Sequence, residues 1–206
     1  ITAIVKGNEN YEEAVKTVNV QVAAPQLEEA PYTIEAVSGN NGWYTSDVKI
    51  IAGEGYTVSD SENGTYSGTY SGTGEGKDKA PKQLFFMNNA GSIATADITT
   101  VNIDMTAPEG EVKAAESGWR KFLNTITFGL FFNDTVVVEA TADDAVSGVD
   151  RIEYYCSKEA KTIEEIKALN DNDWTTDSVK LEKEEKAVVY VRITDKAGNI
   201  TYLSTD

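Results

Sequence analysis

The sequence predicts an all-β protein with two tandem antiparallel β-sandwiches. Three observations predict this class. Residue types that favour strands, namely Thr, Val, Ile and Tyr, are frequent in the chain. Apolar and polar residues alternate over short segments that are separated by turn residues. The chain also resembles itself at several places, which predicts a first sandwich at 24–106 and a second at 107–206.

The internal repeat is clearest in two segments that align without a gap, LFFMNNAGSIA at 84–94 and VRITDKAGNIT at 191–201. Farther upstream, Gly42-Trp43 corresponds to Gly118-Trp119. Tyr66 corresponds to Trp174 after one insertion or deletion. The segment VNIDMTAPEG joins the two repeats, and its proline fixes one backbone angle and restricts the residue before it, so we expect a short, stiff linker.

Individual elements are predicted from the alternation. In the second repeat we expect strands at 135–143, 148–157 and 187–195. The segment 161–170 is the exception, because its apolar residues have helical spacing and Thr162 and Glu165 have the spacing of a capping box. We expect this short crossover helix to pack on an edge or over one end of the second sandwich. Residues 1–23 are expected to form the C-terminal hairpin of a preceding repeat.

The glycine-rich stretch GTYSGTYSGTGEGKD, at 64–78, raises the possibility of phosphate binding. A phosphate-binding P-loop needs a glycine five residues before its Gly-Lys pair and a hydroxyl residue directly after it. Here those positions hold Ser71 and Asp78, and a carboxylate at the second would repel phosphate. We therefore expect a strand at 64–70 followed by a glycine-rich loop at 72–78.

Charge and composition exclude several classes of function. The chain has 18 basic and 34 acidic residues, a net charge of −16, so nucleic acid and anionic lipid are not expected as partners. We also expect no membrane insertion, because no apolar run approaches the roughly 18 residues that a span requires. With no histidine and a single cysteine, the chain cannot form a Ser-His-Asp triad, a Cys-His pair or a histidine zinc site. We expect no enzymatic activity.

Several motifs together resemble tandem bacterial immunoglobulin-like (Ig-like) repeats of Gram-positive cell-surface and secreted proteins. They are the Gly-Trp openings, the turn SGVD before IEYY, the aromatic residue in NDW, the ending DKAGN and the linker IDMTAP. The first repeat departs from this pattern, because it lacks the SGVD turn and the helix. The resemblance implies an extracellular, non-catalytic spacer or stalk that acts as a monomer and contacts neighbouring domains of its parent chain.

Two other functions remain open at this stage. The region could be an adhesin that binds host protein or glycan, or an accessory region of a secreted carbohydrate-active enzyme. For a ligand, we consider the aromatic residues Tyr66, Tyr70 and Trp174, because flat rings stack on the apolar faces of sugars. The alternative is that these rings pack within the sandwiches, which the equivalent positions of Tyr66 and Trp174 in the two repeats favour.

Calcium is the metal that the acidic residues suggest, because it prefers oxygen ligands. Asp104 lies in the linker, and Asp143, Asp144 and Asp150 flank a turn of the second repeat. We therefore consider these four residues as a clamp between the repeats. The alternative is that they form turns and keep the surface soluble, which aspartate does in most loops.

Overall fold

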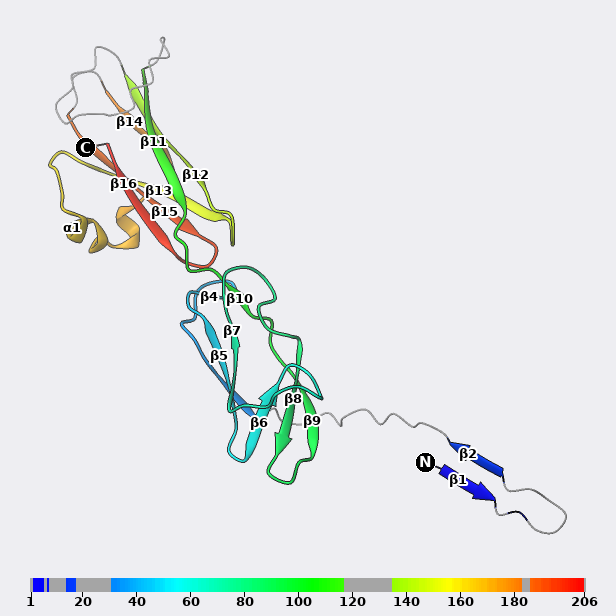
Figure 1. Ribbon diagram of the computed structural model, residues 1–206. Helices are drawn as coiled ribbons and strands as arrows, with labels where there is room; N and C mark the ends of the chain where they lie inside the picture. The colour runs from blue at the N-terminus through cyan, green and yellow to red at the C-terminus, as the bar shows by residue number, and fades with distance from the viewer. Residues whose placement is uncertain are drawn as a thin grey trace.

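The computed structural model describes residues 2–5, 7, 14–17, 31–116, 135–182 and 186–205. It confirms an all-β protein with several antiparallel sheets and one short α-helix. No helix in the described part of the chain is long and apolar enough to cross a membrane. Two bodies of strands lie end to end in Figure 1, and we call them the first unit (31–106) and the second unit (107–205).

The first unit consists of two three-stranded antiparallel sheets that share one apolar core. Their strand orders are β3-β5-β7 and β6-β8-β9, and a short parallel pair, β4 and β10, closes the end near the second unit. Alternation places Val48 and Ile50 of one sheet, and Leu84 and Phe86 of the other, in the core. The strands are β3 (Tyr32–Glu35), β4 (Trp43–Tyr44), β5 (Val48–Ala52), β6 (Tyr56–Ser59), β7 (Thr69–Gly72), β8 (Gln83–Asn88), β9 (Ile93–Asp97) and β10 (Asn102–Ile103).

The second unit repeats this pairing scheme with longer strands. Its sheets have the orders β11-β12-β14 and β13-β15-β16, which match β3-β5-β7 and β6-β8-β9 strand by strand. Val136 and Val138 of the first sheet pack against Val191 and Ile193 of the second. The strands are β11 (Glu109–Glu116), β12 (Val136–Asp143), β13 (Val149–Ser157), β14 (Val179–Leu181), β15 (Val188–Asp195) and β16 (Ile200–Ser204).

Strand β15 is buried at every position, because both faces of its sheet are covered. Helix α1 (Ile163–Lys167) and the 3₁₀ turn Asp171–Asp173 follow β13 and cover the outer face, where Ile166 packs with Val188 and Tyr190. Thr162 caps the helix as predicted: its hydroxyl accepts from Glu165 N at 3.3 Å, and Glu165 Oε2 accepts from Thr162 N at 2.8 Å. The helix therefore lies on a sheet face, not at an edge or end as expected.

Other elements differ from the prediction in extent. Strand β7 begins at Thr69, so most of the strand expected at 64–70 is a loop, in which Tyr66 Oη donates to Glu62 O at 3.0 Å. The loop expected at 72–78 is present, and Gly74 and Gly76 adopt positive φ angles of 72° and 127°. At the N-terminus, β1 (Thr2–Val5) and β2 (Ala14–Thr17) pair antiparallel. That this hairpin ends a preceding repeat stays a prediction.

The separate cores predict separate effects of core substitutions. Leu84 is fully buried in the first core, so Leu84→Ala should destabilise the first unit by about 2 to 5 kcal/mol through lost transfer free energy and a residual cavity. Val138→Ala should destabilise only the second unit. Differential scanning calorimetry would resolve the two transitions. Val37→Ala serves as a control with little effect, because Val37 is 59% exposed. A single transition that both core variants shift equally would contradict independent cores.

Candidate functional site

The candidate site is the junction where the linker Asp104–Pro108 passes from β10 to β11. The glycine-rich loop of the first unit holds one side of this linker. Gly76 N donates to Ile103 O at 2.7 Å, and Ile103 N donates back to Gly76 O at 2.9 Å. Glu75 Oε1 accepts from both Met105 N and Thr106 Oγ1, each at 2.7 Å. The loop that resembles a phosphate site in sequence therefore binds the chain's own linker.

Two turns of the second unit hold the other side. Each begins with an aspartate whose carboxylate accepts backbone N–H groups of its own turn, which is what aspartate commonly does in turns. Asp144 Oδ1 accepts from Val146 N, Ser147 N and Gly148 N at 3.2, 2.9 and 2.6 Å. Asp195 Oδ1 accepts from Gly198 N at 2.6 Å and Asn199 N at 2.9 Å. Ser147 Oγ joins the two turns by accepting from Ala197 N at 3.2 Å.

Hydrogen bonds connect these turns to the linker. Ser147 N donates to Asp104 Oδ2 at 3.0 Å. Asn199 Nδ2 contacts Asp104 O at 3.1 Å, Thr106 O at 3.2 Å and Asp195 Oδ2 at 2.8 Å. Farther along, Thr201 Oγ1 donates to Pro108 O at 2.6 Å. The linker is thus bonded from both sides along most of its length.

The units also contact each other directly. Asn40 N donates to Ala197 O at 2.7 Å, and Asn41 Nδ2 donates to Lys196 O at 2.9 Å. Gly39 makes this approach possible, because a Cβ at its position would collide with Ala197 O. The turn before β4 and the turn between β15 and β16 therefore fit closely only because residue 39 has no side chain.

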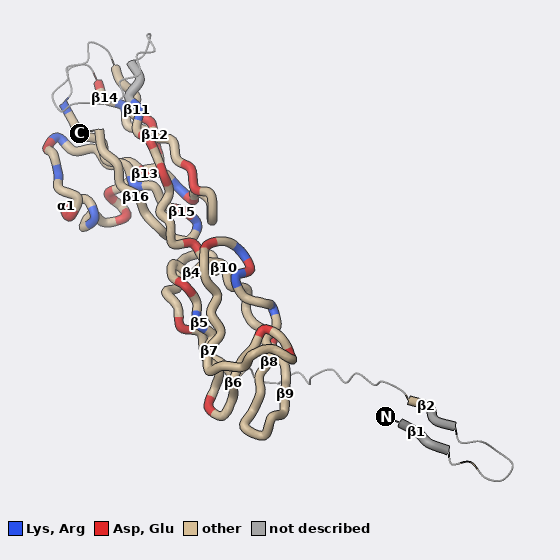
Figure 2. The backbone as a smooth tube through the Cα atoms, in the orientation of Figure 1, with Lys and Arg blue, Asp and Glu red and all other residues tan. Residues whose placement is uncertain are grey.

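Three carboxylates converge at the junction. Single oxygens of Asp104, Asp144 and Asp195 lie within 4.8 Å of one another, and Asp104 and Asp195 are 0% and 1% exposed. Figure 2 shows acidic segments where the two units meet. Burial raises the pKa of Asp104, and repulsion from Asp144 and Asp195 raises it further. Hydrogen bonds from Ser147 and Thr106 offset part of this effect.

The structure brings together two of the four residues that the sequence suggested for calcium. Asp104 and Asp144 meet, and Asp195 joins them. Asp143 lies exposed at the end of β12 opposite Glu109, and Asp150 forms an ion pair with Arg151 at 2.8 Å. Asp195 was missed, although it begins the repeated segment DKAGN. Its counterpart in the first unit, Asn88, caps the corresponding turn by accepting from Ala90 N and Ser92 N at 3.0 Å.

The donor set suits a hard cation in type, since carboxylate oxygens are what calcium prefers. Most of these oxygens already accept one or more N–H groups, however, and only Asp144 Oδ2 has no hydrogen bond among the described residues. In the observed arrangement the donors are backbone N–H groups and the side chains of Asn199 and Ser147. Calcium binding stays a prediction, and a bound ion would have to share oxygens with those donors.

The aromatic residues suggested for ligand binding lie in different surroundings. Trp174 is 8% exposed and packs with Ile166, Val188 and Tyr190 on the outer face of β15. The guanidinium carbon of Arg192 lies 4.7 Å from the centre of its ring. Tyr66 and Tyr70 are half-buried on the first unit. Trp174 therefore contributes to packing, whereas the two tyrosines keep part of their rings accessible.

Fold and junction together define an all-β protein in which two sandwich-like units are joined by a hydrogen-bonded linker. In comparisons with known proteins, no protein-family model and no curated protein matches the sequence.

The raised pKa of Asp104 predicts a pH dependence of stability. Its folded-state pKa lies above the unfolded value of about 3.9. The folded state therefore binds more protons between these two values, and the stabilisation from the protonated carboxyl is lost as pH rises through the folded pKa. Asp104→Asn should lack this loss.

The measurement is the free energy of unfolding in urea at a series of pH values, with a metal chelator present so that no divalent cation is bound. The free energy of unfolding of the parent protein, relative to that of Asp104→Asn, should fall as pH rises above about 4 and then level off. Glu159→Gln, an exposed acid away from the junction, should show no such trend. A pH-independent difference for Asp104→Asn would contradict the argument.

The calcium prediction has its own test. If calcium binds the three carboxylates, millimolar calcium should raise the unfolding midpoint of the parent protein, because the ion stabilises the state that binds it. The increase should be absent in Asp195→Asn and retained in Asp150→Asn, since Asp150 lies outside the cluster. Midpoints that do not respond to calcium or chelator would exclude a clamp by this ion.

Proposed function

We propose that this region is a non-catalytic extracellular spacer of a bacterial cell-surface protein, built from two Ig-like repeats. The role is mechanical: the units hold neighbouring modules of the parent chain at a defined distance and orientation. The observation that carries the proposal is the junction, in which the linker is bonded from both units. A flexible tether would have no need for a buried carboxylate and a close backbone contact between its units.

The repetition of structure supports the assignment to tandem repeats. Sheet orders agree between the units, and so do details of the aligned turns. Asn88 N donates to Ser92 O at 3.0 Å, and Asp195 N donates to Asn199 O at 3.1 Å. Gly91 and Gly198 occupy the same place in these turns with φ angles of 78° and 100°. Units that share one sheet order and are stacked end to end extend a chain in regular steps.

Sheet geometry supports a load-bearing role. In each unit the first strand pairs with the second over its full length, as β11 does with β12 from Glu109 to Glu116. When the chain is pulled along its axis, such ladders are loaded together, so that several hydrogen bonds must break at once. The long β13–β15 ladder, from Val149 to Ser157, adds to this resistance in the second unit.

A stiff junction predicts the effect of one glycine substitution. Gly39→Ala places a Cβ against Ala197 O and should separate the two turns. The parent protein should scatter X-rays as an elongated particle with a narrow distribution of lengths. Gly39→Ala should show a broader distribution, because the Asn40 N to Ala197 O bond can no longer form in its present geometry.

Gly68→Ala is the matched control. No atom lies within 4 Å of a Cβ at Gly68, and its backbone is not in the left-handed region. Its scattering profile should therefore equal that of the parent. A parent protein that already scatters as freely jointed units, or identical profiles for all three proteins, would overturn the proposed stiff spacer.

A further inference from the structure

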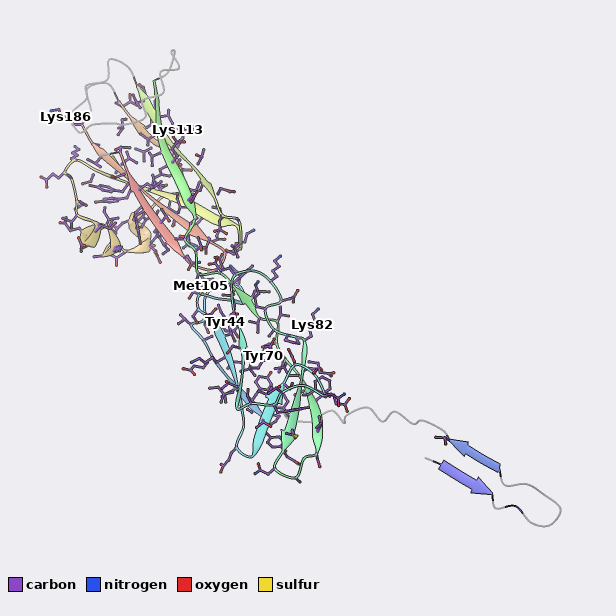
Figure 3. The ribbon with its side chains drawn as sticks, viewed as in Figure 1. Tyr44, Tyr70, Lys82, Met105, Lys113 and Lys186 are labelled. Atoms are coloured by element: carbon purple, nitrogen blue, oxygen red, sulfur yellow. The ribbon has the colours of Figure 1, made fainter. Side chains whose placement is uncertain are left out.

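An open concavity of about 530 Å³ lies on the first unit beside the glycine-rich loop. It is lined by Tyr70, Asp78, Lys79, Ala80, Pro81 and Lys82. Figure 3 labels Tyr70 and Lys82, both on the first unit, on the opposite side of Met105 from the second unit. The concavity therefore adjoins the loop that binds the linker, but no linker residue lines it.

The local charge of this surface departs from that of the whole chain. Lys77, Lys79 and Lys82 fall within six residues of a protein whose net charge is −16. Figure 2 shows basic segments in the loop beside β10. None of the three lysines forms an ion pair with the described part of the chain, although Asp78 lies between two of them. Lys79 and Lys82 line the concavity together with Asp78, so two basic groups and one acid give its lining a net charge of +1.

The backbone that carries the lysines is held in place. Lys79 N donates to Val101 O at 2.7 Å, and Ile98 N donates to Lys82 O at 2.8 Å. Asp78 adopts a positive φ of 52°, which is uncommon for a residue other than glycine, and its N–H donates to Asn102 Oδ1 at 3.1 Å. Gly72 of β7 packs against Lys79 O, where a Cβ would approach to 2.9 Å. The site is thus preorganised against the strand that carries Tyr70.

Tyr70 supplies an aromatic surface and a polar group. Its ring is half-buried against the first core. Burial raises the pKa of Tyr70, and the nearby Asp60 carboxylate raises it further, so the hydroxyl stays protonated at neutral pH. The hydroxyl has no hydrogen-bond partner among the described residues. The half-buried Pro81 adds apolar surface to the same concavity.

We propose that this concavity binds a short acidic saccharide, with Lys79 and Lys82 on its carboxylate and Tyr70 against the apolar face of a sugar ring. A concavity lined by two lysines, one aspartate and an aromatic ring suits a ligand that combines a single negative charge with a flat apolar face. Long polyanions such as nucleic acid fit less well, because the surrounding chain is strongly acidic and repels them. The site goes beyond the spacer role and does not depend on it.

The probe is trigalacturonate, and its methyl ester is the neutral counterpart with the same rings. Binding is measured by titration calorimetry in chelator at low salt. Trigalacturonate should bind saturably, and the ester should bind at least about tenfold more weakly because it lacks the charges. Raising the salt concentration should weaken the interaction, since the ammonium groups are exposed.

Lys79→Gln and Lys82→Gln should each weaken binding by about five- to tenfold, the loss expected for one charge-assisted hydrogen bond at the surface. Tyr70→Phe keeps the ring packing and should weaken binding by only a few-fold through loss of the hydroxyl. Lys180→Gln is the matched control, because Lys180 pairs with Glu182 in the second unit, and it should bind as the parent does.

Three results would overturn the proposal: no saturable binding of trigalacturonate, equal binding of the ester, or equal losses for Lys180→Gln and Lys82→Gln. Tight binding of a short single-stranded oligonucleotide at the same lysines would also overturn it, in favour of a general polyanion site. Scattering of the unliganded protein is unaffected by these outcomes, so the spacer role is judged separately.

Discussion

The arrangement of the two units depends on a carboxylate buried between them. Removing a charged group from water is unfavourable unless hydrogen-bond donors replace the lost solvent. Asp104 meets part of this requirement with donors from two sources, Thr106 N in its own linker and Ser147 N in the second unit, and its raised pKa reflects the part that is not met. If the units separated, the carboxylate would lose one of these donors and regain water. The hydrogen bonding of the Asp104 carboxylate in the folded state therefore depends on the relative position of the two units.

The junction shows how a repeated turn acquires a new role. Asn88 and Asp195 occupy equivalent places and cap equivalent turns, so the turn itself needs only a side-chain oxygen that accepts backbone N–H groups. The second unit differs in having an acid, Asp195, at the first position of this turn and Asn199 four residues later. Asn199 reaches the linker carbonyls, whereas the exposed Ser92 stands at its place in the first unit. The turn that Asn88 caps, between β8 and β9, therefore lacks the side chains with which the equivalent turn of the second unit binds the linker.

The crossover segment that covers the outer face of β15 is held there by a buried ion pair and an aromatic contact. Arg192 is 7% exposed and would be costly to bury alone, but its guanidinium bonds Glu153 Oε2 at 2.9 Å and Asp171 Oδ1 at 2.8 Å. The guanidinium also lies over the ring of Trp174, with its carbon 4.7 Å from the ring centre. These contacts fasten the 3₁₀ turn to the sheet and make the crossover a second small core. The equivalent segment of the first unit, between β6 and β7, has no helix, and the glycine-rich loop lies farther along the chain, between β7 and β8.

The sequence by itself determined the all-β class, the strands at 136–143, 149–157 and 188–195 to within a residue, and the capping box of the helix. These features depend on local alternation and on neighbouring side chains, which a sequence displays directly. Tertiary structure alone decided where the helix packs, which aspartates meet, and that the loop at 72–78 binds the linker. Asp195 lies 91 positions after Asp104, and no local pattern encodes that approach. It arises because two turns at one end of the second unit converge on a linker whose own backbone groups need partners, and only the packed sheets place them there.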